Sequence, residues 1–178
     1  APGGATVGGL LRQGAVVAGP PSWIAGAISS FEMPDTNYLG PDVGLLPNLA
    51  PDHPDRYPTL EGYYADKRLL FRHATPSSTW IVNGDDAATV RMAEGVEGRQ
   101  LRLSARERTD AWFDRSTSTL MLGDVARLSR NELSPPCDHY VATAPAAALV
   151  AHAGRPSPPG RPGGVATGPW PCRRTRWG

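Results

Sequence analysis

The chain has 178 residues, 40% of them hydrophobic, which is enough for one ordinary domain with a core of its own. Residues 155–178 carry five arginines and no acid, so residues 1–154 hold 13 basic and 17 acidic groups and are mildly acidic. This balance argues against nucleic-acid binding, no apolar run is long enough to span a membrane, and two distant cysteines exclude a disulfide framework. With no signal-peptide pattern at the start, we expect a reduced, monomeric cytoplasmic protein with neither a nucleic-acid nor a membrane partner.

The first half of the sequence predicts two buried strands and a helix. "WIAGAI" (Trp23–Ile28) and "VGLLPNLA" (Val43–Ala50) are short apolar runs that are typical of buried strands. Pro47 is out of place in the second run, because a proline cannot donate to a central ladder. Thr59 is a candidate N-cap for a helix that runs to about His73.

The second half alternates strands and helices, which predicts an α/β fold of three layers around a mainly parallel sheet. The Pro/Gly/Arg-rich residues 155–178 cannot build a core and are predicted to be disordered, so the domain covers residues 1–154. The expected elements are a strand and turn over residues 78–86, a helix over 85–93, a strand over 99–104, a β-hairpin with a polar four-residue turn over 111–122, and a helix over 141–154 interrupted by Pro145.

Lys67 is the only lysine in the chain. On a helix it shares one face with apolar and aromatic side chains. One interpretation is a lysine whose stem packs while its ammonium group reaches water. The other is a desolvated amine, which burial keeps neutral and able to capture carbon dioxide as a carbamate, an anionic ligand for a hard cation. The residues that share this face are Leu60, Tyr63, Tyr64, Leu70 and Phe71.

A second candidate group follows the strand that ends near Ala50. Asp52, His53 and Asp55 lie within "PDHPDRYP", and ligands collect at the carboxyl ends of strands in open α/β sheets. The group is either an ordinary polar loop or part of a metal site.

The acids of "NGDD" (Asn83–Asp86) also follow a predicted strand. Such a segment is typical of a turn whose acids cap the next helix. We favour that interpretation over direct catalysis.

Four segments in this order resemble the central domain of the Mur ligase family: "ISSFEM", "VGLLPNLAPDHPDRYPTLEGYYADKRLLFRHA", "WIVNGDD" and "DHYVATAPAAAL". The resemblance covers about residues 20–153. It implies an ATP-dependent ligase of peptidoglycan precursor synthesis that uses Mg²⁺ and activates a carboxylate as an acyl phosphate. Within the family the sequence is most similar to the ligase that joins D-glutamate to UDP-N-acetylmuramoyl-L-alanine.

The resemblance also implies roles for individual residues. His53 is similar to a metal ligand, and Lys67 to the lysine that is carbamylated and positions magnesium. Ser29 is similar to a residue that contacts the substrate or its acyl phosphate. His139 is similar to the histidine of the H-N-x-x-N motif near the nucleotide.

The sequence departs from the family pattern at several of these motifs. The phosphate-binding G-x-x-G-K-[ST] loop needs a lysine, and the only lysine is Lys67, so the central domain is expected to be incomplete in this stretch. Ala27 replaces a metal-binding glutamate, Glu32 a glutamine, and Tyr140 and Thr143 two asparagines. We therefore expect little or no ligase activity from residues 1–178 alone. The alternatives are a degenerate, non-catalytic remnant or binding module of the same fold and, less favoured, a small metal-dependent hydrolase built on Asp52, His53 and Asp55.

Overall fold

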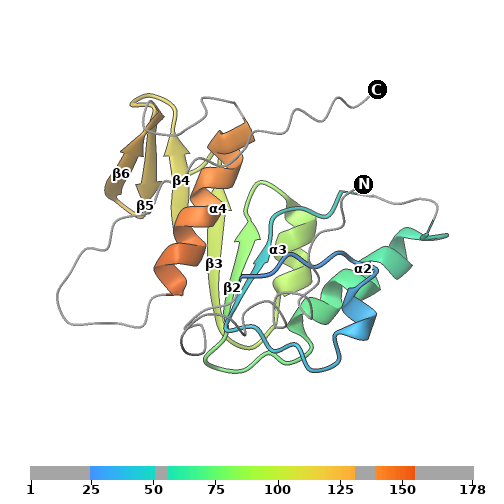
Figure 1. The fold of residues 1–178 in the computed structure, drawn as a ribbon. Helices are drawn as coiled ribbons and strands as arrows, with labels where there is room; N and C mark the ends of the chain where they lie inside the picture. Colours follow the sequence, from blue (N-terminus) through green and yellow to red (C-terminus); the bar gives the residue numbers. More distant parts are fainter. Residues whose placement is uncertain (1–24, 51–55, 131–138, 155–178) are drawn as a thin grey trace, which may run out of the picture. The chain divides into compact units, whose positions relative to one another are not determined.

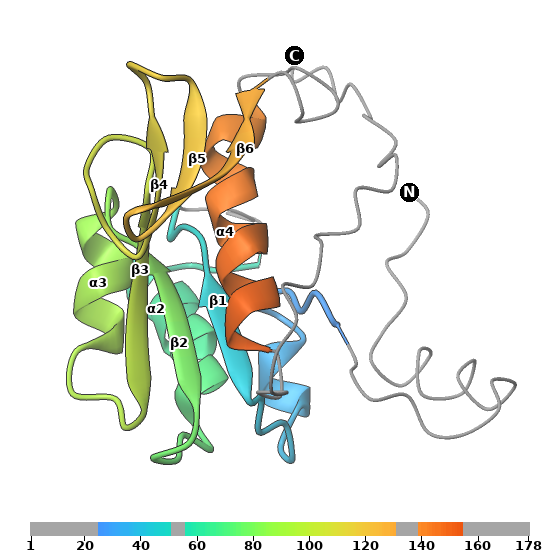
Figure 2. The ribbon, with the colours of Figure 1, turned by 90° about the vertical axis from the view of Figure 1, so that its left-hand side faces the viewer.

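The computed structural model describes residues 25–50, 56–130 and 139–154, with side chains in the last range from residue 143 onward. The chain divides into two compact units, one of Ala1–Leu39 and Pro51–Leu70 and one of Gly40–Ala50 and Phe71–Gly178. The elements are η2 (Met33–Asp35), β1 (Val43–Leu46), α2 (Leu60–Arg68), η3 (Leu69–Phe71), β2 (Thr79–Asn83), α3 (Ala87–Ala93), β3 (Arg99–Ser104), β4 (Ala111–Asp114), β5 (Thr119–Leu122), β6 (Val125–Ser129) and α4 (His139–Ala153). Figure 1 labels the α-helices and β2 to β6, and Figure 2 also labels β1.

The second unit is built on a six-stranded sheet in the order β1-β2-β3-β4-β5-β6. The first four strands are parallel, and β5 and β6 continue the sheet as antiparallel neighbours. β3 and β4 pair at only two positions, Leu103 with Ala111 and Ser104 with Trp112. This small overlap explains how a short loop can join two parallel strands, which usually need a long crossover.

Helices cover both faces of this sheet (Figure 2). On one face, Ala146 and Leu149 of α4 form a core cluster with buried residues of β2, β3 and β4. Successive strand side chains alternate between faces, so Trp80 and Val82 of β2 point to the other face, where α3 packs on β2. The structure therefore confirms the expected α/β architecture of three layers with a mainly parallel sheet.

Two helix starts follow the capping chemistry expected from the sequence. Thr59 caps α2, and its hydroxyl oxygen accepts a hydrogen bond from the Gly62 N–H at 3.2 Å. Asp86 caps α3, and its carboxylate accepts from the Ala88 N–H at 2.9 Å. Side-chain acceptors of this kind satisfy N–H groups that have no partner within the helix. α2 ends at Arg68, and a short 3-10 turn continues to Phe71.

Three expected elements differ from the structure. The strand over Trp23–Ile28 is wrong for its described part, because residues 25–28 form no strand and the first three of them are exposed. Small Ala and Gly side chains offer little surface for a sheet to bury. The strand expected over Val43–Ala50 ends at Leu46, directly before Pro47. The helix expected to be interrupted at Pro145 instead runs through it.

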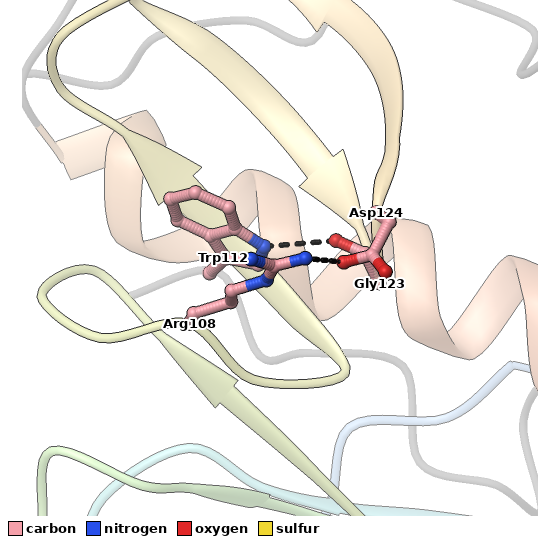
Figure 3. Close-up of polar contacts among 4 residues, drawn as sticks. All are labelled: Arg108, Trp112, Gly123 and Asp124. Carbon is pink, nitrogen blue, oxygen red and sulfur yellow. Dashed lines mark hydrogen bonds and ion pairs between the residues drawn. The ribbon is translucent and has the colours of Figure 1, made fainter.

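The β-hairpin over residues 111–122 is confirmed, and β6 is an addition that the sequence did not predict. Two side chains, one from β4 and one from the loop before it, link this part of the chain to the turn between β5 and β6 (Figure 3). The Trp112 indole N–H donates to the Gly123 carbonyl at 2.9 Å, and Arg108 pairs with Asp124. Both partners of this ion pair are mostly exposed, so we expect it to contribute little to stability.

No helix in the described ranges is both long enough and apolar enough to cross a lipid bilayer.

Candidate functional site

The structure describes two of the four candidate site residues in full. Ser29 and Lys67 both belong to the first compact unit. His53 lies outside the described residues, as do its neighbours Asp52 and Asp55. His139 is the first residue of α4, but its side chain is outside the described part. The metal-related roles that the family resemblance implies for His53 and Lys67 therefore stay predictions.

Ser29 opens a tight turn whose polar groups converge on one carboxylate. The Ser29 N–H donates to Oε2 of Glu32 at 2.9 Å, and the Ser29 hydroxyl donates to the same oxygen. The hydroxyl bond, helped by the backbone bond, lowers the pKa of Glu32 below its usual 4.5. The family pattern has a glutamine at this position, which would also donate hydrogen bonds, whereas the ionised Glu32 can only accept them.

The two residues after Ser29 are held by burial and by a cation–π contact. Ser30 is almost completely buried, with 2% of its surface exposed. The Arg56 guanidinium lies over the Phe31 ring, 4.7 Å from the ring centroid. A guanidinium at this distance is attracted by the negative face of the ring. The S-S-F turn and the beginning of the segment that leads into α2 are therefore in contact.

Lys67 is partly buried on α2, between the two extremes that the sequence left open. Its Nζ lies 5.9 Å from the centroid of the Tyr63 ring, near the outer limit for a cation–π contact. Tyr63 is buried and contacts the rings of Tyr57 and Tyr64. Leu60 is 41% exposed and does not belong to the buried face. The aromatic surroundings expected for Lys67 are thus present, although the residue is not completely desolvated.

The sequence did not predict the contact between Tyr57 and Asp66. The Tyr57 hydroxyl donates to Oδ2 of Asp66 at 2.8 Å. Burial raises the pKa of Tyr57 above its usual 10, a hydrogen bond from Ser30 opposes that rise, and Asp66 adds to it. The hydroxyl is therefore a proton donor at neutral pH. The two residues are nine positions apart, and no local spacing in the sequence signals this contact.

The acids of "NGDD" have the structural role that we favoured. Asp86 Oδ1 accepts from the Ala88 N–H, and its Oδ2 accepts from the Leu49 N–H at 3.0 Å, just beyond β1. Asp85 accepts from the Ser104 hydroxyl at 2.5 Å and from the N–H that follows it at 2.8 Å. These bonds link the carboxyl ends of β1, β2 and β3. Sequence reasoning found the cap but missed the ties to the neighbouring strands, whose donors are 19 to 37 residues away.

The described residues do not complete a metal or nucleotide site. Within them, no group of three or more His, Cys, Asp or Glu side chains could hold a metal ion. Hard cations such as Mg²⁺ need several oxygen ligands. The Ser29 hydroxyl is occupied by Glu32, and the sole lysine of the chain is on α2 rather than in a phosphate-binding loop. The side chains in the described ranges could therefore bind Mg²⁺ and ATP only together with ligands from outside those ranges.

Comparison with known proteins agrees with the motifs and the fold. Residues 28–128 match the family model described as the Mur ligase middle domain. Proteins named UDP-N-acetylmuramoylalanine--D-glutamate ligase are 28% identical over 145 residues in Bacillus velezensis and 30% identical over 144 residues in Bacillus subtilis. These alignments cover 82% and 81% of this chain but 32% of each relative. The chain therefore spans about a third of the length of these curated relatives.

Solved structures show the same fold at lower sequence identity. MurF from Acinetobacter baumannii superimposes with a TM-score of 0.52 at 21% identity, covering 64% of this chain and 26% of that one. A UDP-N-acetylmuramoyl-L-alanyl-D-glutamate--2,6-diaminopimelate ligase gives a TM-score of 0.53 at 21% identity, covering 72% of this chain and 29% of that one.

Proposed function

Because the chain belongs to the Mur ligase family as part of its middle domain, we propose that it derives from an ATP-dependent ligase that joins D-glutamate to UDP-N-acetylmuramoyl-L-alanine. The observation that carries this proposal is the shared name of the curated relatives whose alignments cover about four fifths of the chain. The solved neighbours include MurF and a diaminopimelate ligase, and their identity of 21% supports the fold alone. The proposed place of action is the cytoplasm, in peptidoglycan precursor synthesis.

In this proposal the chain contributes residues that bind and orient, with no covalent enzyme intermediate. ATP would supply the phosphoryl group that activates the substrate carboxylate, with ADP as the leaving group, and Mg²⁺ would offset the phosphate charge. The D-glutamate amine would then displace inorganic phosphate from the acyl phosphate to form the amide bond. Ser29 would contact the substrate, His53 and a carbamylated Lys67 would serve the metal ion, and His139 would lie near the nucleotide. A carbamate on Lys67 would convert a cation into an anionic oxygen ligand, which is the donor type that Mg²⁺ prefers.

The second candidate is a non-catalytic remnant or binding module of the same fold. It is favoured by one observation: the chain has a single lysine, and that lysine is on α2. Without a second lysine and its glycine-rich loop, no phosphate cradle of the usual kind can form from these residues. We therefore expect residues 1–178 alone to show little or no ligase activity. Measurable ATP-dependent incorporation of labelled D-glutamate by the purified chain would contradict this expectation.

The single lysine makes a direct test of the proposed site practical. The protein is equilibrated with ¹³C-bicarbonate and its carbamate signal is recorded by ¹³C NMR. A Lys67→Arg variant keeps the positive charge, cannot form the carbamate, and identifies any signal from the terminal amine. We expect a carbamate signal that the variant lacks and that Mg²⁺ strengthens. Identical spectra, together with no heat and no thermal stabilisation on titration with ATP and Mg²⁺, would favour the remnant.

A further inference from the structure

Tyr57 connects two segments of the first unit that each carry a proposed site residue. Its hydroxyl donates to Asp66 Oδ2 at 2.8 Å, and Asp66 directly precedes Lys67 on α2. Ser30, which directly follows Ser29 in the S-S-F turn, acts on the same hydroxyl and opposes the rise of the Tyr57 pKa. The residue before Tyr57 contacts that turn as well, since the Arg56 guanidinium lies 4.7 Å from the centroid of the Phe31 ring. Tyr57 thus lies between the turn that carries Ser29 and the residue before Lys67.

The ring of Tyr57 makes a second connection to the same lysine. It meets the Tyr63 ring edge to face, with the centroids 5.4 Å apart and the planes at 76°. Tyr63 is one turn before Lys67 on α2, and the lysine Nζ lies over its ring. Edge-to-face aromatic pairs have a preferred geometry, so movement of the Tyr57 ring would disturb the Tyr63 ring that the ammonium group faces at 5.9 Å.

The interactions of the Tyr57 hydroxyl are of a kind that holds this side chain in one position. The acceptor on Asp66 is charged, and charge-assisted hydrogen bonds are shorter and stronger than neutral ones. Ser30 is buried, so the loss of its partner would leave a buried hydroxyl without that hydrogen bond, which is costly. Tyr57 itself is only partly exposed. The hydroxyl therefore has donors and acceptors on both sides and little freedom to move away from them.

We propose that Tyr57 is a positioning residue that holds the Lys67 amine in register with the S-S-F turn that carries Ser29. This inference rests on the proposed function for its biological meaning, since it assigns Tyr57 a role in presenting the lysine of that site. Tyr57 touches no reacting atom in this proposal and acts only through Asp66, Ser30 and Tyr63. The geometry itself does not depend on whether Lys67 is carbamylated.

The test measures the reactivity of the only lysine in the chain. The rate at which Lys67 is acetylated by a limiting amine-reactive ester is followed by peptide mass spectrometry in the folded protein. Tyr57→Phe removes the hydroxyl and keeps the ring. Ser30→Ala removes the other partner of the hydroxyl without touching Lys67. Tyr38→Phe is the matched control, because Tyr38 is 99% exposed and loses the same atom.

Both test variants are expected to raise the acetylation rate by about two- to tenfold, the range that corresponds to the net strength of one hydrogen bond. The control should leave the rate unchanged, and in urea all variants should react equally. Because Asp66 is beside Lys67, its own replacement alters the local charge. The decisive comparison is therefore made in an Asp66→Ala background, which leaves the Tyr57 hydroxyl no side-chain acceptor at this position, so Tyr57→Phe should add little.

Three results would overturn the proposal. The first is a Tyr57→Phe variant that reacts like the control while its circular dichroism spectrum is unchanged. The second is a Tyr57→Phe effect that is as large in the Asp66→Ala background as in the natural chain. The third applies if Tyr57→Phe does not fold: a Ser30→Ala variant that folds and reacts like the control then contradicts the proposal. Failure of the proposed function looks different, because the wild type would show no carbamate while the acetylation rates would still respond to Tyr57.

Discussion

Replacement of Asp86 by alanine should destabilise the sheet unit, because this carboxylate makes two separate contacts. The carboxylate caps α3 through the Ala88 N–H and holds the Leu49 N–H with its other oxygen. Leu49 is 3% exposed, so its N–H would lose a buried partner. One side chain therefore secures both the start of a helix and the exit of β1.

The expected loss follows from these two contacts. Removal of an N-cap costs about 0.5–2 kcal/mol, and loss of a hydrogen bond to a charged acceptor costs about 1.5–3 kcal/mol. Asp86→Ala should therefore lower the free energy of unfolding by about 2–5 kcal/mol, a large share of the roughly 5–15 kcal/mol that is typical of a domain. Asp86→Asn should lose about half as much, because the amide oxygen can still cap α3 while its NH₂ group would face the Leu49 N–H.

Equilibrium unfolding in urea, followed by circular dichroism, measures these differences. Asp42→Ala is the control, since Asp42 is an exposed aspartate immediately before β1 in the same unit. It should change the free energy of unfolding by no more than about 0.5 kcal/mol. A loss for Asp86→Ala no larger than that of the control, or an equal loss for the alanine and asparagine variants, would refute the reasoning.

Two further predictions concern a glycine and a titrating acid. Gly98→Ala should cost about 3 kcal/mol or more in urea unfolding, because φ is +113° and a Cβ would lie 2.5 Å from the Ser78 carbonyl oxygen. Gly95→Ala, with φ of +71° and open space around it, should cost only about 1 kcal/mol; equal losses would contradict this. Glu32 should titrate below pH 4.5 by NMR, so its stabilising effect is present above that pH and is lost as the pH falls through the lowered pKa. Ser29→Ala should move the midpoint up toward 4.5, and an unchanged midpoint would exclude the Ser29 hydroxyl as the main cause.

The elements that could be predicted from the sequence are those whose signals are local. Thr59 and Asp86 each lie two or three residues before the N–H that they cap, so the letters alone contain both partners. The strand over Arg99–Ser104 was predicted with its observed bounds, and the hairpin that follows it was predicted with its four-residue turn. The motif order was also enough to identify the family, because it depends on residue type and spacing.

Other features depended on neighbours that the sequence does not place. Residues 25–28 form no strand although they are apolar, because a strand needs a pairing edge as well as a suitable composition. Pro145 lies within α4 and is fully buried, so packing there outweighs the missing backbone hydrogen bond. β6 has three exposed residues in a row and lacks the alternation that marks a strand, yet β5 provides the edge with which it pairs.

In the candidate site, too, some features follow from local sequence and others depend on tertiary contacts. The sequence by itself determined that one amine, that of Lys67, lies among aromatic rings on a helix, because helical spacing brings Tyr63 and Tyr64 to its side. Only the tertiary structure decided that Tyr57 spans from the S-S-F turn to Asp66. Helical periodicity relates residues within α2, whereas a contact between a turn and a helix depends on how the chain folds back on itself, and no local spacing encodes that path.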